Sequence, residues 1–244
     1  MRNLRLDLCY DGTRYKGWQR LAQEDNTIQA KLEQALSRIL GEPVEVTGSG
    51  RTDAGTHALG QVVNVHCYST MPCQEILSQL RRYLPEDIGI YSCRNVSERF
   101  HARLNAKTKT YRYRIWNSEL PCVFDRKYVC FDSRAFDVEA MQDAAQLFLG
   151  THDFSAFCTN KNSKKSTVRT IHSFSVERTG EELVFTVNGN GFLHNMVRIL
   201  VGTLVEVGTG ERSAEEIPAL FGGKRADAGM TMPACGLCLM EVTY

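Results

Sequence analysis

Alternating apolar and polar residues characterise the first segment of the chain. Between Asn3 and Tyr10, leucine occupies every second position from residue 4 to residue 8 and charged residues lie between, which is the period of a half-buried strand. The turn sequence Thr179-Gly180 predicts a hairpin between two later segments of similar character. Further strands are predicted where β-branched and aromatic residues are frequent, at residues 44–46, 62–65, 88–96, 109–117, 170–177, 182–187 and 236–242.

Apolar residues recur at helical spacing in four segments, and cap or stop residues bound these segments. Asp137 is a suitable N-cap for one predicted helix, and Gly150 is a suitable stop for it. Gly41 and Gly208 follow the last apolar positions of two others. The predicted helices cover residues 28–40, 72–84, 138–149 and 194–207.

The predicted elements follow the order β-α-β-β-α-β twice, which is the ferredoxin-like order. The joint between the two repeats lies near residues 100–107. We therefore predict an α/β (α+β) fold with two ferredoxin-like halves, residues 1–103 and 104–244. We expect their sheets to meet edge to edge, with a groove across the seam.

The stretch from Gly48 to Ala58 is the strongest candidate for chemistry. Its three glycines favour tight or positive-φ backbone, and predicted strands flank it. An acid, Asp53, and a base, Arg51, lie on this loop, where side chains are placed to act on a ligand. Asp53 stands where a dinucleotide-binding fingerprint needs its third glycine, and a strand follows instead of a helix, so that interpretation fails. An ordinary turn remains the alternative.

Composition indicates a globular protein of the cytoplasm. The chain has 244 residues, of which 43% are hydrophobic and 23% are charged, and we find neither an apolar signal region nor an apolar run of membrane-spanning length. Its nine cysteines follow no disulfide spacing, which favours reduced thiols. Cys235 and Cys238 have no second pair at metal spacing, so we predict no zinc site. His57, Tyr15 and Trp18 are interpreted mainly as packing residues, with RNA contact as the alternative.

Charge is nearly balanced over the whole chain, at a net +1, but two segments carry bases and no acid. Residues 99–114 contain six bases interleaved with aromatic side chains, and residues 158–172 contain four more bases. Such segments suit a phosphate backbone with unstacked bases, and a solvated face is the alternative. The predicted RNA-binding residues are Arg103, Lys107, Lys109, Lys164 and Lys165.

The predicted helix over residues 194–207 is apolar around nearly its whole circumference, so it should be buried. Arg198 lies in the middle of these apolar residues, where an unpaired charge is costly. We predict that Arg198 pairs with Asp53 and keeps that carboxylate charged, as a nucleophile requires. The alternative is that the Arg198 side chain extends to the surface.

Together these segments resemble the tRNA pseudouridine synthase A family over essentially the whole chain. The most specific motif is Gly50-Arg51-Thr52-Asp53-Ala54-Gly55, followed by His57-Ala58. The remaining matching motifs, in order, are Tyr10-Asp11-Gly12-Thr13 with Gly17-Trp18-Gln19, Phe100-His101-Ala102-Arg103, Tyr111-Arg112-Tyr113, Gly150-Thr151-His152-Asp153-Phe154, Gly191-Phe192-Leu193, Met196-Val197-Arg198, Pro233-Ala234 and Gly236-Leu237.

The resemblance implies a role for five residues. Asp53 matches the catalytic aspartate, Arg198 the basic residue that pairs with it, and Tyr111 the tyrosine that stacks on the target base. Arg51 matches an arginine implicated in turning the uridine out of the stack, and Leu237 falls at an apolar position of the active site. The resemblance further implies conversion of uridine to pseudouridine at tRNA positions 38, 39 and 40, in a homodimer with a central RNA-binding cleft and without metal or organic cofactor.

Some points stay open at the level of sequence. Thr56 stands where many members carry valine, and Cys238 where an aromatic residue is frequent, which leaves fine substrate preference in doubt. Asp53 is suited to attack C1′, to attack C6 or to abstract a ribose proton. Two rival functions are an RNA-binding protein without catalysis, and a hydrolase of small substrates with a carboxylate nucleophile.

Overall fold

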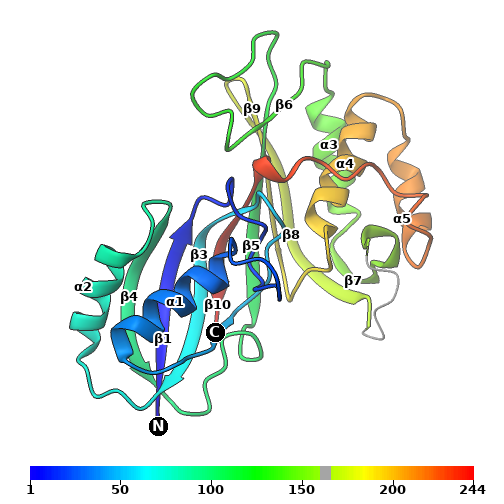
Figure 1. Cartoon of the computed structure of the whole chain (residues 1–244). Helices are drawn as coiled ribbons and strands as arrows, with labels where there is room; N and C mark the ends of the chain where they lie inside the picture. The colour runs from blue at the N-terminus through cyan, green and yellow to red at the C-terminus, as the bar shows by residue number, and fades with distance from the viewer. Residues whose placement is uncertain (160–165) are drawn as a thin grey trace. The chain divides into compact units, whose positions relative to one another are not determined.

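Figure 1 shows the computed structural model of the chain, which describes residues 1–159 and 166–244. The chain forms two compact units of mixed α/β structure, which confirms the predicted fold class. Unit 1 comprises Met1–Lys107 and Leu239–Tyr244, and unit 2 comprises Thr108–Cys238. The end of the chain thus belongs to the N-terminal unit, a division that differs from the predicted halves 1–103 and 104–244, because the last strand joins the unit 1 sheet beside β3.

Unit 1 follows the predicted β-α-β-β-α-β order. Its antiparallel sheet has the strand order β4-β1-β3-β10, with β2 paired to β3, and α1 and α2 lie on one face of it (Figure 1). Leu4, Leu6 and Leu8 of β1 are fully buried, as the alternating pattern predicts. The elements are β1 Arg2–Tyr10, α1 Ile28–Leu40, β2 Val46–Gly48, β3 His57–Cys67, α2 Cys73–Tyr83, β4 Ile88–Val96 and, shared with unit 2, β10 Leu237–Thr243.

Capping residues define the start and the end of helix α1. The side chain of Thr27 accepts a hydrogen bond from the Ala30 amide at its start, and Gly41 adopts the left-handed conformation at its end. The prediction of a strand at residues 44–46 was wrong by two residues. The Val44 amide instead donates to the Ser37 hydroxyl (3.1 Å), so this segment remains attached to α1 until β2 begins at Val46.

Unit 2 has the strand order β5-β9-β8-β7, with β6 parallel to β5. The predicted hairpin forms from β8 and β9, and α3 packs on β8 through Gln142 and Gln146, which donate to the carbonyls of Val176 and Phe174. The elements are β5 Thr108–Trp116, β6 Cys130–Phe131, α3 Val138–Gln146, β7 Gly150–Asp153, β8 Val168–Thr179, β9 Glu182–Gly189, α4 Met196–Gly208 and α5 Ile217–Leu220.

Three short elements, β6, β7 and α5, were not predicted because each has too few residues to show a period. Helix α3 also ends at Gln146, three residues before its predicted last residue, 149. The amides of Leu147, Phe148 and Leu149 donate to carbonyls three residues back, so the last turn is a tighter 3₁₀-type turn. Within the part of the chain that the structure describes, every helix is too short or too polar to cross a membrane.

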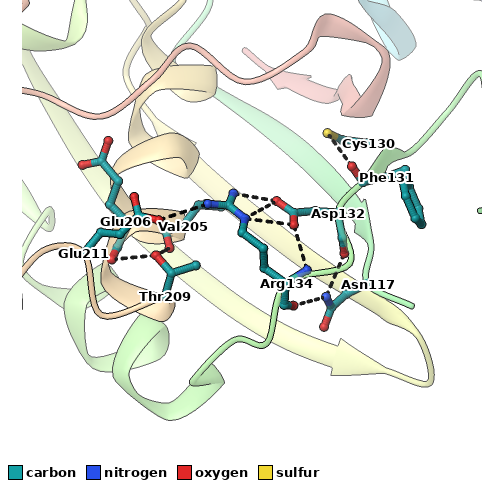
Figure 2. A network of polar contacts seen from close by, with 9 residues as sticks. All are labelled: Asn117, Cys130, Phe131, Asp132, Arg134, Val205, Glu206, Thr209 and Glu211. Carbon is teal, nitrogen blue, oxygen red and sulfur yellow. Dashed lines mark hydrogen bonds and ion pairs between the residues drawn. The ribbon is translucent and has the colours of Figure 1, made fainter. Parts of the chain in front are cut away.

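A polar network in unit 2 connects the segment after β6 to Glu211, in the segment that follows α4 (Figure 2). Arg134 donates from Nη2 to one carboxylate oxygen of Asp132 (2.7 Å) and from Nε to the other (3.1 Å), and it contacts Glu211 at 3.4 Å. Asn117 donates to the backbone carbonyls of both Asp132 and Arg134. Burial raises the pKa of Asp132, but the hydrogen bonds and charge of Arg134 outweigh it and hold that pKa below its usual value.

The lowered pKa of Asp132 predicts a pH-dependent contribution to stability. Because the carboxylate is favoured in the folded state, its contribution is present above the unfolded pKa and is lost as the pH falls through the folded pKa. We expect Asp132→Asn to lower the free energy of unfolding by about 0.5–1 kcal/mol near neutral pH, and by much less below about pH 4. Urea unfolding across this pH range, with exposed Asp143→Asn as the control, measures this. A loss independent of pH would contradict the ion-pair explanation.

Candidate active site

The Asp53 loop, residues 48–58, runs from the last residue of β2 to the first two residues of β3 in unit 1. Asp53 is half-buried and Arg51 is exposed, so both side chains are accessible to a ligand. Thr52 between them is buried, and its hydroxyl lies 2.8 Å from the Tyr10 hydroxyl. The loop is therefore anchored from within while its charged residues remain at the surface.

A second loop, residues 11–18, packs against the backbone of the Asp53 loop. A Cβ atom on Gly12 would overlap the carbonyl oxygen of Thr56, and one on Gly17 would lie 2.8 Å from that of Thr52. Gly17 also has φ of 99°, a conformation that other residues rarely adopt. The amide of Trp18 donates to the Thr52 carbonyl at 3.0 Å. The two loops thus approach as closely as bare backbones allow.

Buried polar side chains hold the Asp53 loop and its neighbouring loop by hydrogen bonds. Gln61 is fully buried; it donates to the Gly50 carbonyl (3.1 Å) and accepts from the Ser49 hydroxyl (2.6 Å). The Nδ1 atom of His57 accepts from the Gly12 amide (3.1 Å), which attaches the second loop to the start of β3. Tyr15 and Trp18 are buried as well, in agreement with the packing interpretation of all three of these aromatic residues.

The close approach of the two loops predicts how a methyl group added at Gly17 changes the stability of the fold. Gly17→Ala adds backbone strain and an overlap with the Asp53 loop, and we expect it to lower the free energy of unfolding by about 2–4 kcal/mol. Gly41→Ala is the matched control, because Gly41 also has positive φ but nothing lies within 4 Å of its added Cβ. It should cost only about 1 kcal/mol. If urea unfolding shows equal losses of unfolding free energy for Gly17→Ala and Gly41→Ala, the contact with the Asp53 loop contributes nothing to stability.

Helix α4 carries Arg198 in unit 2. Eleven of its thirteen residues are buried, which confirms the predicted burial, and Arg198 is half-buried. Its Nε donates to the Met232 carbonyl and its Nη1 donates to Asn195 Oδ1, both at 2.6 Å. The predicted pairing of Arg198 with Asp53 stays a prediction. The helix begins at Met196 and not at 194, because Asn195 has φ of 62° and cannot continue a right-handed helix.

Tyr111 lies in the middle of β5 and is 7% exposed. Its ring packs edge-on against Phe192, with centroids 5.2 Å apart and an interplanar angle of 83°. Phe192 belongs to the loop between β9 and α4, which also carries Asn195. Sequence reasoning did not assign a role to Phe192 or Asn195, because nothing in their spacing shows what they contact.

Leu237 begins β10 and is 5% exposed, and the segment before it is held at two points. The hydroxyl of buried Tyr113 donates to the Pro233 carbonyl at 2.7 Å, and Arg198 donates to the carbonyl of Met232. Tyr113 and Arg198 therefore fix the path of the chain that leads to Leu237.

The predicted RNA-binding residues lie in different places. Arg103 and Lys107 are exposed in unit 1, and Lys109 is half-buried at the start of β5 in unit 2, whereas Lys164 and Lys165 lie outside the described residues. Arg103 sits on a tight turn in which His101 Nδ1 accepts from the amides of Arg103 and Leu104. The preceding segment is anchored on the sheet by two buried asparagines, Asn3 and Asn64.

Among residues 1–159 and 166–244, no group of three or more histidine, cysteine, aspartate and glutamate side chains is arranged to hold a metal ion. Burial raises the pKa of the Cys235 thiol, which disfavours the thiolate form that metals bind.

Comparison with known proteins shows similarity along the full chain. A family model described as tRNA pseudouridine synthase matches residues 9–105 and 144–244, which include Arg51, Asp53, Arg198 and Leu237 but not Tyr111. Proteins named tRNA pseudouridine synthase A from Acetivibrio thermocellus and from Bacillus sp. strain KSM-64 are 48% and 46% identical over 245 residues, covering all of both chains. A protein from Clostridium tetani named tRNA pseudouridine synthase A 1 is also 46% identical with the same coverage. Superposition on a chain from the crystal structure of a Cbf5-Nop10-Gar1 complex covers 97% of this chain and 48% of that chain, at 11% identity and a TM-score of 0.38, which is too low to support a conclusion.

Proposed function

This chain belongs to the tRNA pseudouridine synthase family, and we propose that it isomerises uridine to pseudouridine at positions 38, 39 and 40 in the anticodon stem-loop of tRNA. The observation that supports this most directly is the complete Gly50–Gly55 motif with Asp53, in a chain that is 44–48% identical over its full length to proteins named tRNA pseudouridine synthase A. The proposal includes action as a homodimer in the cytoplasm, without metal or organic cofactor.

In this proposal Asp53 is the catalytic nucleophile. The reaction breaks the bond between C1′ and N1, rotates the uracil and joins C1′ to C5, without redox change or net hydrolysis. A carboxylate serves it by attacking C1′ or C6, and abstraction of a ribose proton is the third route. The half-buried position of Asp53 on a closely packed loop supports its role as the nucleophile. A nucleophile acts best when its geometry is set before the substrate binds.

The other site residues would retain and orient the uracil after the bond breaks. We propose that Tyr111 stacks on the base, that Leu237 forms part of an apolar wall, and that Arg198 pairs with Asp53. The ring of Tyr111 is held by Phe192, and the guanidinium of Arg198 is held by two hydrogen bonds, so both are oriented without substrate.

Binding of the stem-loop would expose the target base. Turning a nucleotide out of a stem costs a few kcal/mol, which contacts to the phosphate backbone can offset. We assign this binding to Arg103, Lys107 and Lys109, with Lys164 and Lys165, and the opening of the stem to Arg51. The exposed positions of Arg103, Lys107 and Arg51 support these assignments.

Release of tritium from tRNA labelled at uridine C5 tests the proposal, because C5 loses its hydrogen when it bonds to C1′. We expect release by the wild-type protein, and a rate lowered by roughly 10³-fold or more in Asp53→Ala and Asp53→Asn. Asp25→Asn, an exposed aspartate outside the Asp53 loop, should leave the rate unchanged.

Each rival function has its own outcome when tRNA binding and the turnover of small substrates are measured together with tritium release. Binding of tRNA by the wild type without any release would support an RNA-binding protein. Turnover of a small substrate at a rate that does not depend on tRNA would support a hydrolase. Release that survives both Asp53 substitutions would show that another residue is the nucleophile.

A further inference from the structure

We infer that Asn195 is a positioning residue for Arg198, and that its side-chain amide sets the orientation of the guanidinium for the reaction. The inference rests on the proposed role of Arg198 as the partner of the catalytic carboxylate. It concerns a residue next to the start of α4 that neither its spacing nor the family resemblance singles out.

The hydrogen bonds of Asn195 form a chain within unit 2. A guanidinium only donates hydrogen bonds, so the oxygen of the Asn195 amide faces Arg198 Nη1, at 2.6 Å. The amide nitrogen then donates to the Thr159 hydroxyl at 2.9 Å. The Thr159 hydroxyl also lies within hydrogen-bond distance of His194 Nδ1, at 2.6 Å, and the tautomer of His194 decides which atom donates. Asn195 is therefore fixed at both ends of its amide.

The backbone conformation of Asn195 indicates that this arrangement is imposed. Asn195 has φ of 62° and ψ of 5°, and among residues 1–159 and 166–244 no other residue except glycine has positive φ. An asparagine at the N-cap of a helix usually accepts a hydrogen bond from an amide of the first turn, but here the side chain makes no such bond. The amide is used on Arg198 instead. Strained residues of this kind concentrate at functional sites.

Two bonds from separate segments determine the plane of the guanidinium. Met232 provides a carbonyl for Nε, and Asn195 provides an amide oxygen for Nη1. The guanidinium is planar, so holding two of its nitrogens orients the whole group. Loss of the Asn195 bond would leave the charge of Arg198 in place but release its orientation, which affects the chemical step more than the binding of tRNA.

The experiment compares Asn195→Ala with Asn195→Gly in the tritium-release assay, together with thermal unfolding. Both variants remove the amide, and we expect both to lower kcat about 10- to 100-fold while KM for tRNA changes by less than about twofold. Only alanine keeps the strain of positive φ, so the melting temperature should fall in Asn195→Ala and be retained in Asn195→Gly. If the role of Asn195 were purely structural, Asn195→Gly would keep the wild-type kcat, and the inference would be overturned.

A double substitution shows whether Asn195 acts through Arg198. In an Arg198→Lys background, Asn195→Gly should lower kcat by less than about twofold further, whereas independent losses that multiply would overturn the inference. Asn117→Ala is the matched control, since it also removes an asparagine amide of unit 2 that accepts a hydrogen bond from an arginine, Arg178, and donates from its nitrogen, here to the carbonyls of Asp132 and Arg134. It should leave kcat unchanged.

The outcomes also separate this inference from the proposed function. If Arg198→Lys loses activity and Asn195→Gly does not, only the role of Asn195 fails. If Arg198→Lys keeps the wild-type kcat, the role of Arg198 fails and the role of Asn195 fails with it. If the wild type releases no tritium, the proposed function itself is wrong.

Discussion

Close backbone contact between two loops of unit 1 is the constraint on which the position of Asp53 depends. Gly12 and Gly17 bring residues 11–18 against the carbonyls of Thr56 and Thr52, at distances that leave no room for a side chain. Backbone atoms cannot change rotamer, so this contact restricts the Asp53 loop more firmly than side-chain packing would. The strand β1, which leads directly into residues 11–18, is therefore part of the support of the site.

Neutral polar groups also hold the Asp53 loop and the Arg198 side chain in position. In unit 1 the fully buried amide of Gln61 holds the loop that carries Asp53, and in unit 2 the carbonyl of Met232 and the amide of Asn195 hold Arg198. Dipoles of this kind accept hydrogen bonds from two nitrogens of the half-buried arginine and carry no net charge. Neutral partners of this kind are compatible with the role proposed for Arg198, which is to face a carboxylate.

The proposed catalytic residues are divided between the two units. Asp53 and Arg51 belong to unit 1, whereas Tyr111, Arg198 and Leu237 belong to unit 2. Neither unit contains the complete set, so the proposed reaction needs the whole chain. Similarity to the curated synthases likewise extends over the full length of the chain.

The sequence by itself determined the main elements and the candidate residues. A strand at residues 88–96 and a helix at 28–40 were predicted with their observed bounds, because a period of two or of 3.6 residues is a local property of the chain. Asp53 and Arg198 became candidates because a charge on a glycine-rich loop or in an apolar helix stands out from its neighbours, and their roles stay predictions. Tertiary structure alone decided the contact of Phe192 with Tyr111, the left-handed conformation of Asn195 and the short strands β6 and β7. These features depend on contacts between residues that are distant in sequence, and such contacts leave no period to detect.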